Sequence, residues 1–387
     1  MPVFVLLHAA FSAVILAFHV AMAAGCVVNL RRDARRRRDA RRRTDAPTPA
    51  AGGPTVEVIV ALRDEAPSLP SLLAALERQE GCRFLFVDDR SVDSTGALLD
   101  SFCQRRPGSA RVIHMSEEPM QLTGKQAALD RAFDEATAEI LLFTDGDCVP
   151  PPGWARRMAC PFVDPDVGIV LGRIELPRGA SFLADFQAFE QPLLNQYNFG
   201  SAGMGLPTGC FGNNMAIRAE AVRATGGFRR LGYSVTEDAL LLDAVCRGGG
   251  WKVRVCTDLE AAVLTRPKGT WREFVDQHTR WNAGALFSPD IVTRASYMFV
   301  VLFYLVGSLL VLPFGLLDWR VPLLSLNSFL SIGLLAALGG VYPGKARGPY
   351  YLKLLPYLFF FGFFYSWITV RAFVRRRLDW KGSTLRP

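Results

Sequence analysis

The sequence predicts an α/β protein with a doubly wound, mostly parallel sheet and transmembrane helices at its N- and C-terminal ends. Two observations predict this class. Residues 55–286 alternate short apolar runs with runs of helical spacing, as βα units do. Residues 1–30 and 287–374 hold stretches that are far more apolar than this middle region, long enough to cross a bilayer as helices.

The N-terminal segment is expected to be a signal anchor. Residues 2–30 have only His8 and His19 as interior titratable groups. Residues 31–43 then hold nine arginines and two aspartates, which gives +7 of the net charge of +8. A cleaved signal peptide carries its basic cluster in front of the apolar stretch, so this order favours an anchor with residue 31 onward inside. A nucleic-acid arm is the competing interpretation of the arginine run, but its position favours a flank on the anionic cytoplasmic leaflet.

Residues 31–54 are thus a basic juxtamembrane segment followed by a Pro/Ala/Gly linker. At the other end, apolar segments occupy residues 297–317, 321–341 and 354–374, and the middle one is interrupted by polar residues. If all three cross, the basic tail at 375–387 lies outside, against the positive-inside tendency. If one is re-entrant or interfacial, the tail returns to the cytoplasm, and both arrangements stay open.

The eight cysteines show no C-x-x-C pairing and are scattered over strand-like and helix-like runs. We therefore expect reduced core cysteines of a cytoplasmic domain, and neither a disulfide framework nor a zinc site.

The middle region is expected to form one domain over residues 55–286. Strands are predicted at 56–62, 83–87, 111–114, 140–143 and 167–176, and helices at 68–79, 94–102, 125–136, 219–225 and 271–286. Alternation of this kind places ligands at the C-terminal ends of the parallel strands. Residues 182–199 are aromatic and amphipathic, and could lie on the membrane surface, border an acceptor groove or pack in the core.

The strand at 140–143 runs directly into two aspartates, Asp145 and Asp147, separated by Gly146. Carboxylates at this edge of an open α/β sheet lie where ligands bind. Two of them one residue apart can hold a hard divalent cation that also takes phosphate oxygens, so Mg²⁺ or Mn²⁺ is expected. The alternative is a buried strand that ends in a polar turn.

Further marked residues follow in a fixed order along the chain. The full set is Arg63-Asp64-Glu65, Asp88-Asp89-Arg90-Ser91, Thr123-Gly124-Lys125, Asp145-Gly146-Asp147, Thr236-Glu237-Asp238 and Gln277-His278-Thr279-Arg280-Trp281. This set resembles the family 2 inverting glycosyltransferases with a GT-A fold, specifically their membrane-integrated branch with a Q-x-x-R-W signature. The resemblance covers residue 55 to about residue 286 and the general membrane layout.

The resemblance implies a nucleotide-diphosphate sugar as donor, with uridine the expected nucleotide and guanosine the alternative. Asp147 would be a metal ligand, and Asp145 would share the metal or contact the ribose. Glu65 and Asp89 would accept hydrogen bonds from the base and ribose, and Lys125 would lie near the base or diphosphate. The family usually has Asn where this chain has Asp64, so residue 64 is given no direct role.

Inversion needs one general base, and the resemblance assigns it to Asp238, with Glu237 as its neighbour. Plain N-capping of a helix is the alternative role for these two carboxylates. Gln277, Arg280 and Trp281 share one helical face because they stand at i, i+3 and i+4. In the resembled family this face holds the diphosphate and borders the acceptor, whereas an amphipathic helix on the bilayer surface is the alternative.

Other polar residues lie near these motifs in the sequence. His278 lies off the Q-x-x-R-W face and is expected to have no role. Asn213, Asn214 and Arg218 follow a glycine-rich turn and are further candidates for contact with the donor sugar or the acceptor.

The predicted function is transfer of a sugar to a lipid or lipid-linked acceptor at the cytoplasmic face of a membrane, such as the bacterial inner membrane. A processive polysaccharide synthase of the chitin, hyaluronan or poly-glucosamine type is the alternative. A scaffold or sensor with a degenerate site would lack a metal or base carboxylate, and none is missing here. A transporter is disfavoured because the spans show no repeat. No nucleic-acid partner is expected, and the oligomeric state stays open.

Overall fold

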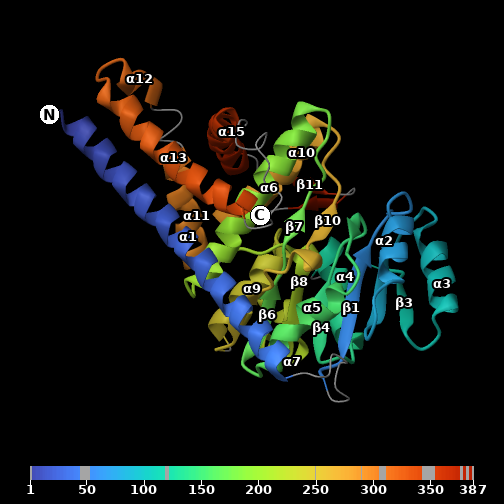
Figure 1. The fold of residues 1–387 in the computed structure, drawn as a ribbon. Helices are drawn as coiled ribbons and strands as arrows, with labels where there is room; N and C mark the ends of the chain where they lie inside the picture. Colours follow the sequence, from blue (N-terminus) through green and yellow to red (C-terminus); the bar gives the residue numbers. More distant parts are fainter. Residues whose placement is uncertain are drawn as a thin grey trace.

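The computed structural model describes residues 2–43, 53–117, 122–248, 250–288, 290–304, 311–341, 354–374, 378–380 and 383–385. Figure 1 shows an α/β domain to which a long N-terminal helix and a group of C-terminal helices are attached. All eight cysteines are unpaired, in line with the prediction that excluded a disulfide framework.

A seven-stranded sheet forms the centre of the domain. In spatial order its strands are β3 (Ala110–Met115), β2 (Arg83–Asp89), β1 (Val56–Leu62), β4 (Ile140–Phe143), β8 (Met215–Arg218), β6 (Val167–Leu171) and β9 (Lys252–Val255). All neighbouring pairs are parallel except those that involve β8, which is antiparallel to both β4 and β6. The predicted doubly wound, mostly parallel sheet is confirmed.

Helices cover both faces of this sheet. They are α2 (Leu69–Leu76), α3 (Thr95–Arg105), α4 (Gly124–Glu135), α5 (Trp154–Ala159), α7 (Ala219–Thr225), α8 (Gly227–Leu231) and α9 (Glu237–Gly248). Helix α10 (Trp271–Leu286) packs instead against the C-terminal helices α11 (Ile291–Tyr304) and α15 (Leu354–Val374). Alternate residues of β1 serve two cores: Ile59 packs with side chains of α4 and α9, and Val58 packs with those of α2, α3 and α5. Short 3₁₀ turns lie at Cys160–Val163, Gly212–Asn214 and Leu259–Ala261.

The single strand predicted at 167–176 is wrong. The structure divides it into β6 and β7 (Ile174–Glu175), and β7 joins a second, three-stranded sheet with β5 (Cys148–Val149) and β10 (Val263–Thr265). The chain changes sheets at Gly172, whose N–H donates to the backbone oxygen of Asn214 at 2.8 Å. A Cβ at position 172 would lie 2.3 Å from the Asn214 side chain, so that side chain occupies the space that a continuous strand would need.

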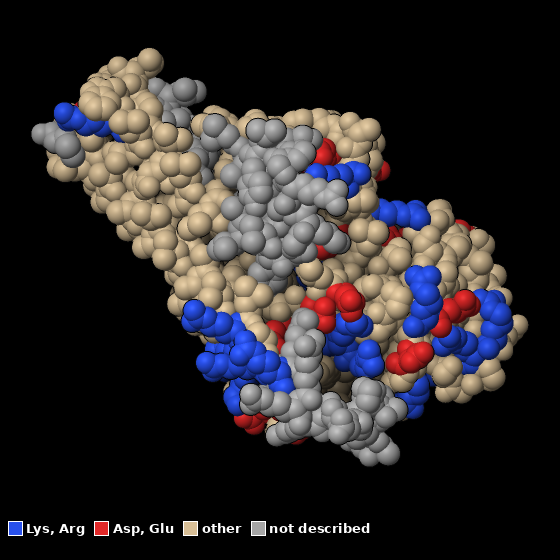
Figure 2. All heavy atoms as spheres, in the orientation of Figure 1, with Lys and Arg blue, Asp and Glu red and all other residues tan. Residues whose placement is uncertain are grey.

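The N-terminal helix α1 (Val3–Arg43) continues without a break from the apolar segment through the arginine run. Asp33 fixes it to the α/β domain by accepting a hydrogen bond of 2.7 Å from the backbone N–H of Thr257. Figure 2 shows a largely uncharged surface along the helical arm and a cluster of basic side chains where α1 reaches the domain. Exposed arginines at 31, 32 and 35 lie in this cluster.

Helix α6 (Phe182–Gly203) crosses α1 at backbone contact. A Cβ at Gly200 would lie 2.6 Å from the backbone oxygen of Met22, and one at Gly25 would lie 2.1 Å from that of Gly200. Only glycine permits this approach. The amphipathic segment at 182–199 is therefore packed inside the protein, between α1 and the α/β domain, and it also borders a cavity described below.

The C-terminal helices are α11 (Ile291–Tyr304), α12 (Val311–Gly315), α13 (Arg320–Val341) and α15 (Leu354–Val374), followed by the short strands β11 (Leu378–Trp380) and β12 (Ser383–Leu385). Within the described residues, α1 and α15 are long and apolar enough to cross a membrane. The basic residues at 375–377, which bear on the side of the C-terminus, lie outside the described residues.

Three polar residues of α13 contact α1. Ser325 is 2.9 Å from the His8 ring, and Ser331 is 3.1 Å from the ring of His19. Asn327 donates to the hydroxyl of Ser12 at 3.0 Å. Side-chain hydrogen bonds of this kind hold helices together where little water competes. The polar residues that made 321–341 a weaker predicted span thus form hydrogen bonds between α13 and α1, which lie side by side in Figure 1.

Candidate active site

The parallel strands β1, β2 and β4 bring three acidic segments to one edge of the sheet. Glu65 follows β1, Asp89 ends β2, and Asp145 and Asp147 follow β4. A cavity of about 730 Å³ opens at this edge. All ten residues predicted for the site line it: Glu65, Asp89, Lys125, Asp145, Asp147, Glu237, Asp238, Gln277, Arg280 and Trp281. The structure thus brings the predicted residues together, while their chemical roles stay predictions.

Lys125 connects two of the acidic motifs. Its ammonium lies 2.7 Å from Oδ1 of Asp145 and 3.3 Å from Oε1 of Glu237. Burial lowers the pKa of Lys125, but the charges of Asp145 and Glu237 more than offset this, so the pKa is raised and the side chain is cationic. It lies at the first turn of α4, where Gly124 enters the helix with φ of +57°.

Asp238 is held at the start of α9 by backbone donors. The N–H of Gly212 donates to its Oδ2 at 2.7 Å, and the N–H of Ala239 donates to its Oδ1 at 2.9 Å. Burial and the neighbouring charge of Glu237 raise the pKa of Asp238 to about 6. A carboxylate with a pKa close to neutral can take a proton in one step and lose it in the next, as a general base must.

Asp145 and Asp147 offer the donor set that a hard divalent cation needs. Burial, followed by the charge of Asp145, raises the pKa of Asp147, so an added cation would be stabilising here. Lys268, which was not predicted, lies 3.9 Å from Oδ2 of Asp147. The described residues contain no cluster of three or more potential ligands.

Two loops with unusual backbone conformations form the other side of the donor end. Asp64 has φ of +52°, and its carboxylate accepts a hydrogen bond of 2.8 Å from the N–H of Val92. Asp and Asn adopt this backbone conformation more readily than most residues. The backbone at position 64 therefore suits both the Asp of this chain and the Asn that the resembled family usually has. Oδ2 of Asp89 is buried without a hydrogen bond from any described residue, 3.9 Å from Nη1 of Arg63. It is therefore held beside the Arg63 guanidinium at the cavity wall.

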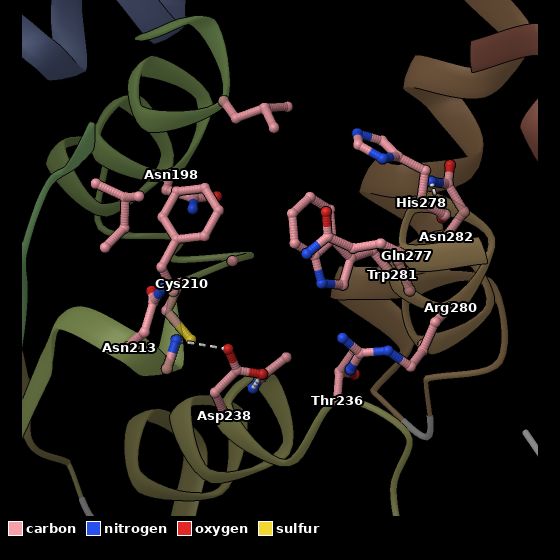
Figure 3. Close-up of a pocket in the computed structure, with 18 of the residues that line it drawn as sticks. Asn198, Cys210, Asn213, Thr236, Asp238, Gln277, His278, Arg280, Trp281 and Asn282 are labelled. Carbon is pink, nitrogen blue, oxygen red and sulfur yellow. Dashed lines mark hydrogen bonds between the residues drawn. The ribbon is translucent and has the colours of Figure 1, made fainter. Parts of the chain in front are cut away.

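Helix α10 supplies the wall opposite these loops. Thr270 and Glu273 form a capping box at its N-terminus, which fixes where the helix begins. In Figure 3, Gln277, Trp281 and Arg280 extend from α10 toward the cavity, and Asp238 lies below them on α9. Gly284 brings α10 against the turn before α9, since a Cβ there would lie 2.3 Å from the Thr236 side chain. Within the described residues, the guanidinium of Arg280 has no hydrogen bond or ion pair and remains available to an anion.

The same cavity continues away from the carboxylates into the helical part of the protein. There its wall is formed by α1, α6, α11 and α15 and is largely apolar. Residues of this wall include Phe18, Met22, Leu194, Val300, Val301 and Phe361. The cavity therefore joins a charged end at the sheet to an apolar end between the helices.

The comparisons with known proteins now identify the domain. The family model described as Glycosyl transferase family 2 matches residues 57–226. These residues form a glycosyl transferase family 2 domain. A mannosyltransferase from Pyrobaculum calidifontis, solved in complex with GDP-Man and Mn²⁺, superposes with a TM-score of 0.51 at 17% identity and covers 92% of this chain and 99% of its own. The expected GT-A-like fold is confirmed by this likeness. The family model confirms the expected class of glycosyltransferase for the domain.

Curated relatives match part of the chain at lower coverage. A β-monoglucosyldiacylglycerol synthase from Synechocystis sp. is 26% identical over 284 residues, which are 67% of this chain and 56% of that protein. A pre-mycofactocin glycosyltransferase from Mycobacterium tuberculosis is 27% identical over 181 residues, which are 45% of this chain and 35% of that protein. The matched part of the chain thus spans between about a third and just over half of the length of these relatives.

His278, for which no role was expected, also lines the cavity of the glycosyltransferase. It is buried, and its Nε2 lies 3.1 Å from Oε1 of the buried Glu190 on α6. Lys268 also lines the cavity and was not predicted from the sequence. Its backbone is held by Gln187 of α6, whose side chain accepts from the Lys268 N–H at 2.8 Å and donates to its carbonyl at 3.1 Å. Both contacts join residues more than 80 positions apart, which no local pattern reveals.

Two of the three further candidates prove to be structural. Arg218 donates to the backbone oxygens of Phe162, Val167 and Asp164 and does not line the cavity. Asn214 is fully buried and connects the two sheets: it accepts from the Trp154 indole at 2.9 Å and donates to the carbonyls of Arg173 at 2.7 Å and Ala261 at 3.0 Å. Asn213, in contrast, does line the cavity.

These neighbouring asparagines give a matched test. Asn214→Ala removes three buried hydrogen bonds and is expected to reduce the free energy of unfolding by about 3 kcal/mol. Asn213→Ala is expected to change it by less than about 0.5 kcal/mol. Thermal unfolding of the purified variants in one detergent measures both effects. Equal melting temperatures for the two variants would contradict the structural role of Asn214.

Proposed function

We propose that this protein is a membrane-bound inverting glycosyltransferase that transfers a sugar from a nucleotide-diphosphate sugar to a lipid or lipid-linked acceptor at the cytoplasmic face. One observation carries the proposal. A single cavity connects the acidic edge of the glycosyltransferase domain with the apolar space between α1, α6, α11 and α15. A lipid acceptor needs such a path, because its hydroxyl must reach the donor while its hydrocarbon stays away from water.

The donor end suits a nucleotide diphosphate. The carboxylates of Asp89 and Glu65 line this end of the cavity and would accept hydrogen bonds from N–H and O–H groups of a base and ribose. Arg280 and Lys268 supply positive charge around the position of the diphosphate, and Lys125 supplies a third cation within reach of Asp145. Anionic leaving groups are stabilised by fixed positive groups of this kind.

A divalent cation fits the carboxylates at this end. Asp145 and Asp147 would hold it, and the remaining positions would be filled by donor phosphates and water. When bound, such an ion acts as a Lewis acid that neutralises the negative charge on the departing diphosphate. The mannosyltransferase of Pyrobaculum calidifontis, solved in complex with GDP-Man and Mn²⁺, supports this assignment by analogy of fold.

Asp238 is placed to act as the general base. The acceptor hydroxyl gives its proton to Asp238 while its oxygen forms a bond to the anomeric carbon of the donor sugar. The bond between that carbon and the phosphate oxygen breaks on the opposite side, and the diphosphate keeps the electron pair. The two backbone donors at Gly212 and Ala239 fix the carboxylate and leave lone pairs to receive the proton.

The lipid nature of the acceptor is supported by three further features. The two candidate membrane spans are α1 and α15, and both contribute to the apolar end of the cavity. The basic cluster on α1 is placed to meet an anionic leaflet. The Synechocystis relative is named for a product built on diacylglycerol.

Product partitioning tests this function. Membranes from cells that express the chain would receive labelled UDP- and GDP-sugars with Mn²⁺ or Mg²⁺, and the label would be divided between an organic extract and a polymer fraction. We expect label in the organic extract. With Asp238→Asn this label should fall by about 10²- to 10⁴-fold, because the base is lost while the fold is kept. Label that accumulates in the polymer fraction would instead support a processive synthase.

The pKa of Asp238 predicts a pH profile. Because the base must be deprotonated, kcat/KM should be constant above pH 7 and fall about tenfold per unit below the pKa of about 6. Glu237→Gln removes a neighbouring negative charge, so it lowers the pKa of Asp238 and should move this acid limb to lower pH. Initial rates from pH 4.5 to 8 measure the shift. An acid limb that stays in place in Glu237→Gln would contradict the assignment.

A further inference from the structure

The two ends of the cavity differ sharply in charge. Its basic residues gather at the donor end and comprise Arg63, Lys125, Arg266, Lys268 and Arg280. Three of these lie within 4.0 Å of the acidic motifs, as the contacts of Arg63 with Asp89, Lys125 with Asp145 and Lys268 with Asp147 show. Along the part of the wall formed by α1, α6, α11 and α15, no described residue is lysine or arginine, and Glu190 is the one acidic residue.

Glu190 is paired with side chains of neighbouring helices. Its Oε1 lies 3.1 Å from Nε2 of His278 on α10, and Nδ1 of the same ring lies 2.9 Å from the carbonyl oxygen of Phe274. Tyr365 of α15 also forms a side-chain hydrogen bond with Glu190. Glu190 therefore adds no positive charge that a phosphate could meet in this part of the wall.

Uncharged polar groups face the cavity beside this pair. Gln191 is 5% exposed and lines the cavity, and its Nε2 has no hydrogen-bond partner among the described residues. Asn198 extends from α6 toward the same space, opposite Gln277 and Trp281 of α10 (Figure 3). Amides both donate and accept, and therefore match hydroxyl groups, which do the same.

We propose that the acceptor is an uncharged, hydroxyl-bearing lipid, either a lipid alcohol or a neutral glycolipid, and not a lipid phosphate. This inference rests on the proposed transfer to a lipid. A phosphate held against the wall formed by α1, α6, α11 and α15 would lose its hydration without meeting a cation of that wall, which is costly for any buried charge. It would also approach the carboxylates of Glu237 and Asp238. Sugar, glycerol or lipid hydroxyls find amide partners there and bring no charge.

Matched lipids separate the effect of the head group from that of the tail. The full chain in detergent would receive a labelled donor with diacylglycerol or phosphatidic acid of the same acyl chains, and with a polyprenol or its phosphate. In each pair we expect the neutral lipid to be glycosylated at least about tenfold faster. Faster or equal transfer to the phosphate member of either pair would overturn the inference.

Binding gives a second readout that does not depend on transfer. Displacement of a fluorescent diacylglycerol should require at least about tenfold more phosphatidic acid than diacylglycerol. If this order is observed while no donor supports transfer, the proposed function fails and the charge selectivity stands. If phosphatidic acid displaces the probe as well as diacylglycerol does, the selectivity fails whatever the enzyme does.

A matched pair of variants tests whether the selectivity arises at the cavity wall. Gln191→Lys adds a cation to this part of the wall and should increase the affinity for phosphatidic acid relative to diacylglycerol. Gln191→Met has a similar length without a charge and should leave the preference for the neutral lipid in place. A Gln191→Lys protein that binds donor normally and keeps the original preference would contradict the proposed position of the head group.

Discussion

The ammonium of Lys125 lies between carboxylates that come from distant parts of the chain, and the arrangement of the site depends on this contact. Asp145 follows a strand at the centre of the sheet, whereas Glu237 begins a helix almost 100 residues later. Without a cation between them, these carboxylates and Asp238 would repel each other in a partly dehydrated cavity. The charge balance of the donor end is therefore set before any nucleotide or metal ion enters.

The helices outside the α/β domain form the rest of the cavity wall. Helix α6 packs against α1 through glycine contacts, holds the loop that carries Lys268 through Gln187, and presents amides to the cavity. Asp33 of α1 is tied to Thr257, so the helix that would enter the membrane is rigidly joined to the domain. In the proposed function, these contacts would also fix the position of the cavity relative to the bilayer and the path of the acceptor to Asp238.

The parts of this structure that depend on local periodicity could be predicted from the sequence. Strand β4 and helices α7 and α10 have the predicted bounds, because their apolar spacing and end signals are strong. The acidic motifs could be placed at one edge, because parallel strands end together. The second sheet could not be predicted, since its strands are two or three residues long and depend on Asn214 to join distant segments. The same holds for Lys268 and the Glu190–His278 pair, whose positions are set by contacts with α6.

Photo-crosslinking of a lipid tests the central claim most directly, which is that one cavity brings the acceptor to the donor. The full chain would be placed in nanodiscs with a diacylglycerol that carries a diazirine on its acyl chain, and the adducts would be mapped by mass spectrometry. The account predicts adducts on the cavity-facing residues Leu194, Val300 and Phe361, which unlabelled diacylglycerol displaces. Adducts confined to outward-facing residues such as Leu323, Leu330 and Val370 would contradict it.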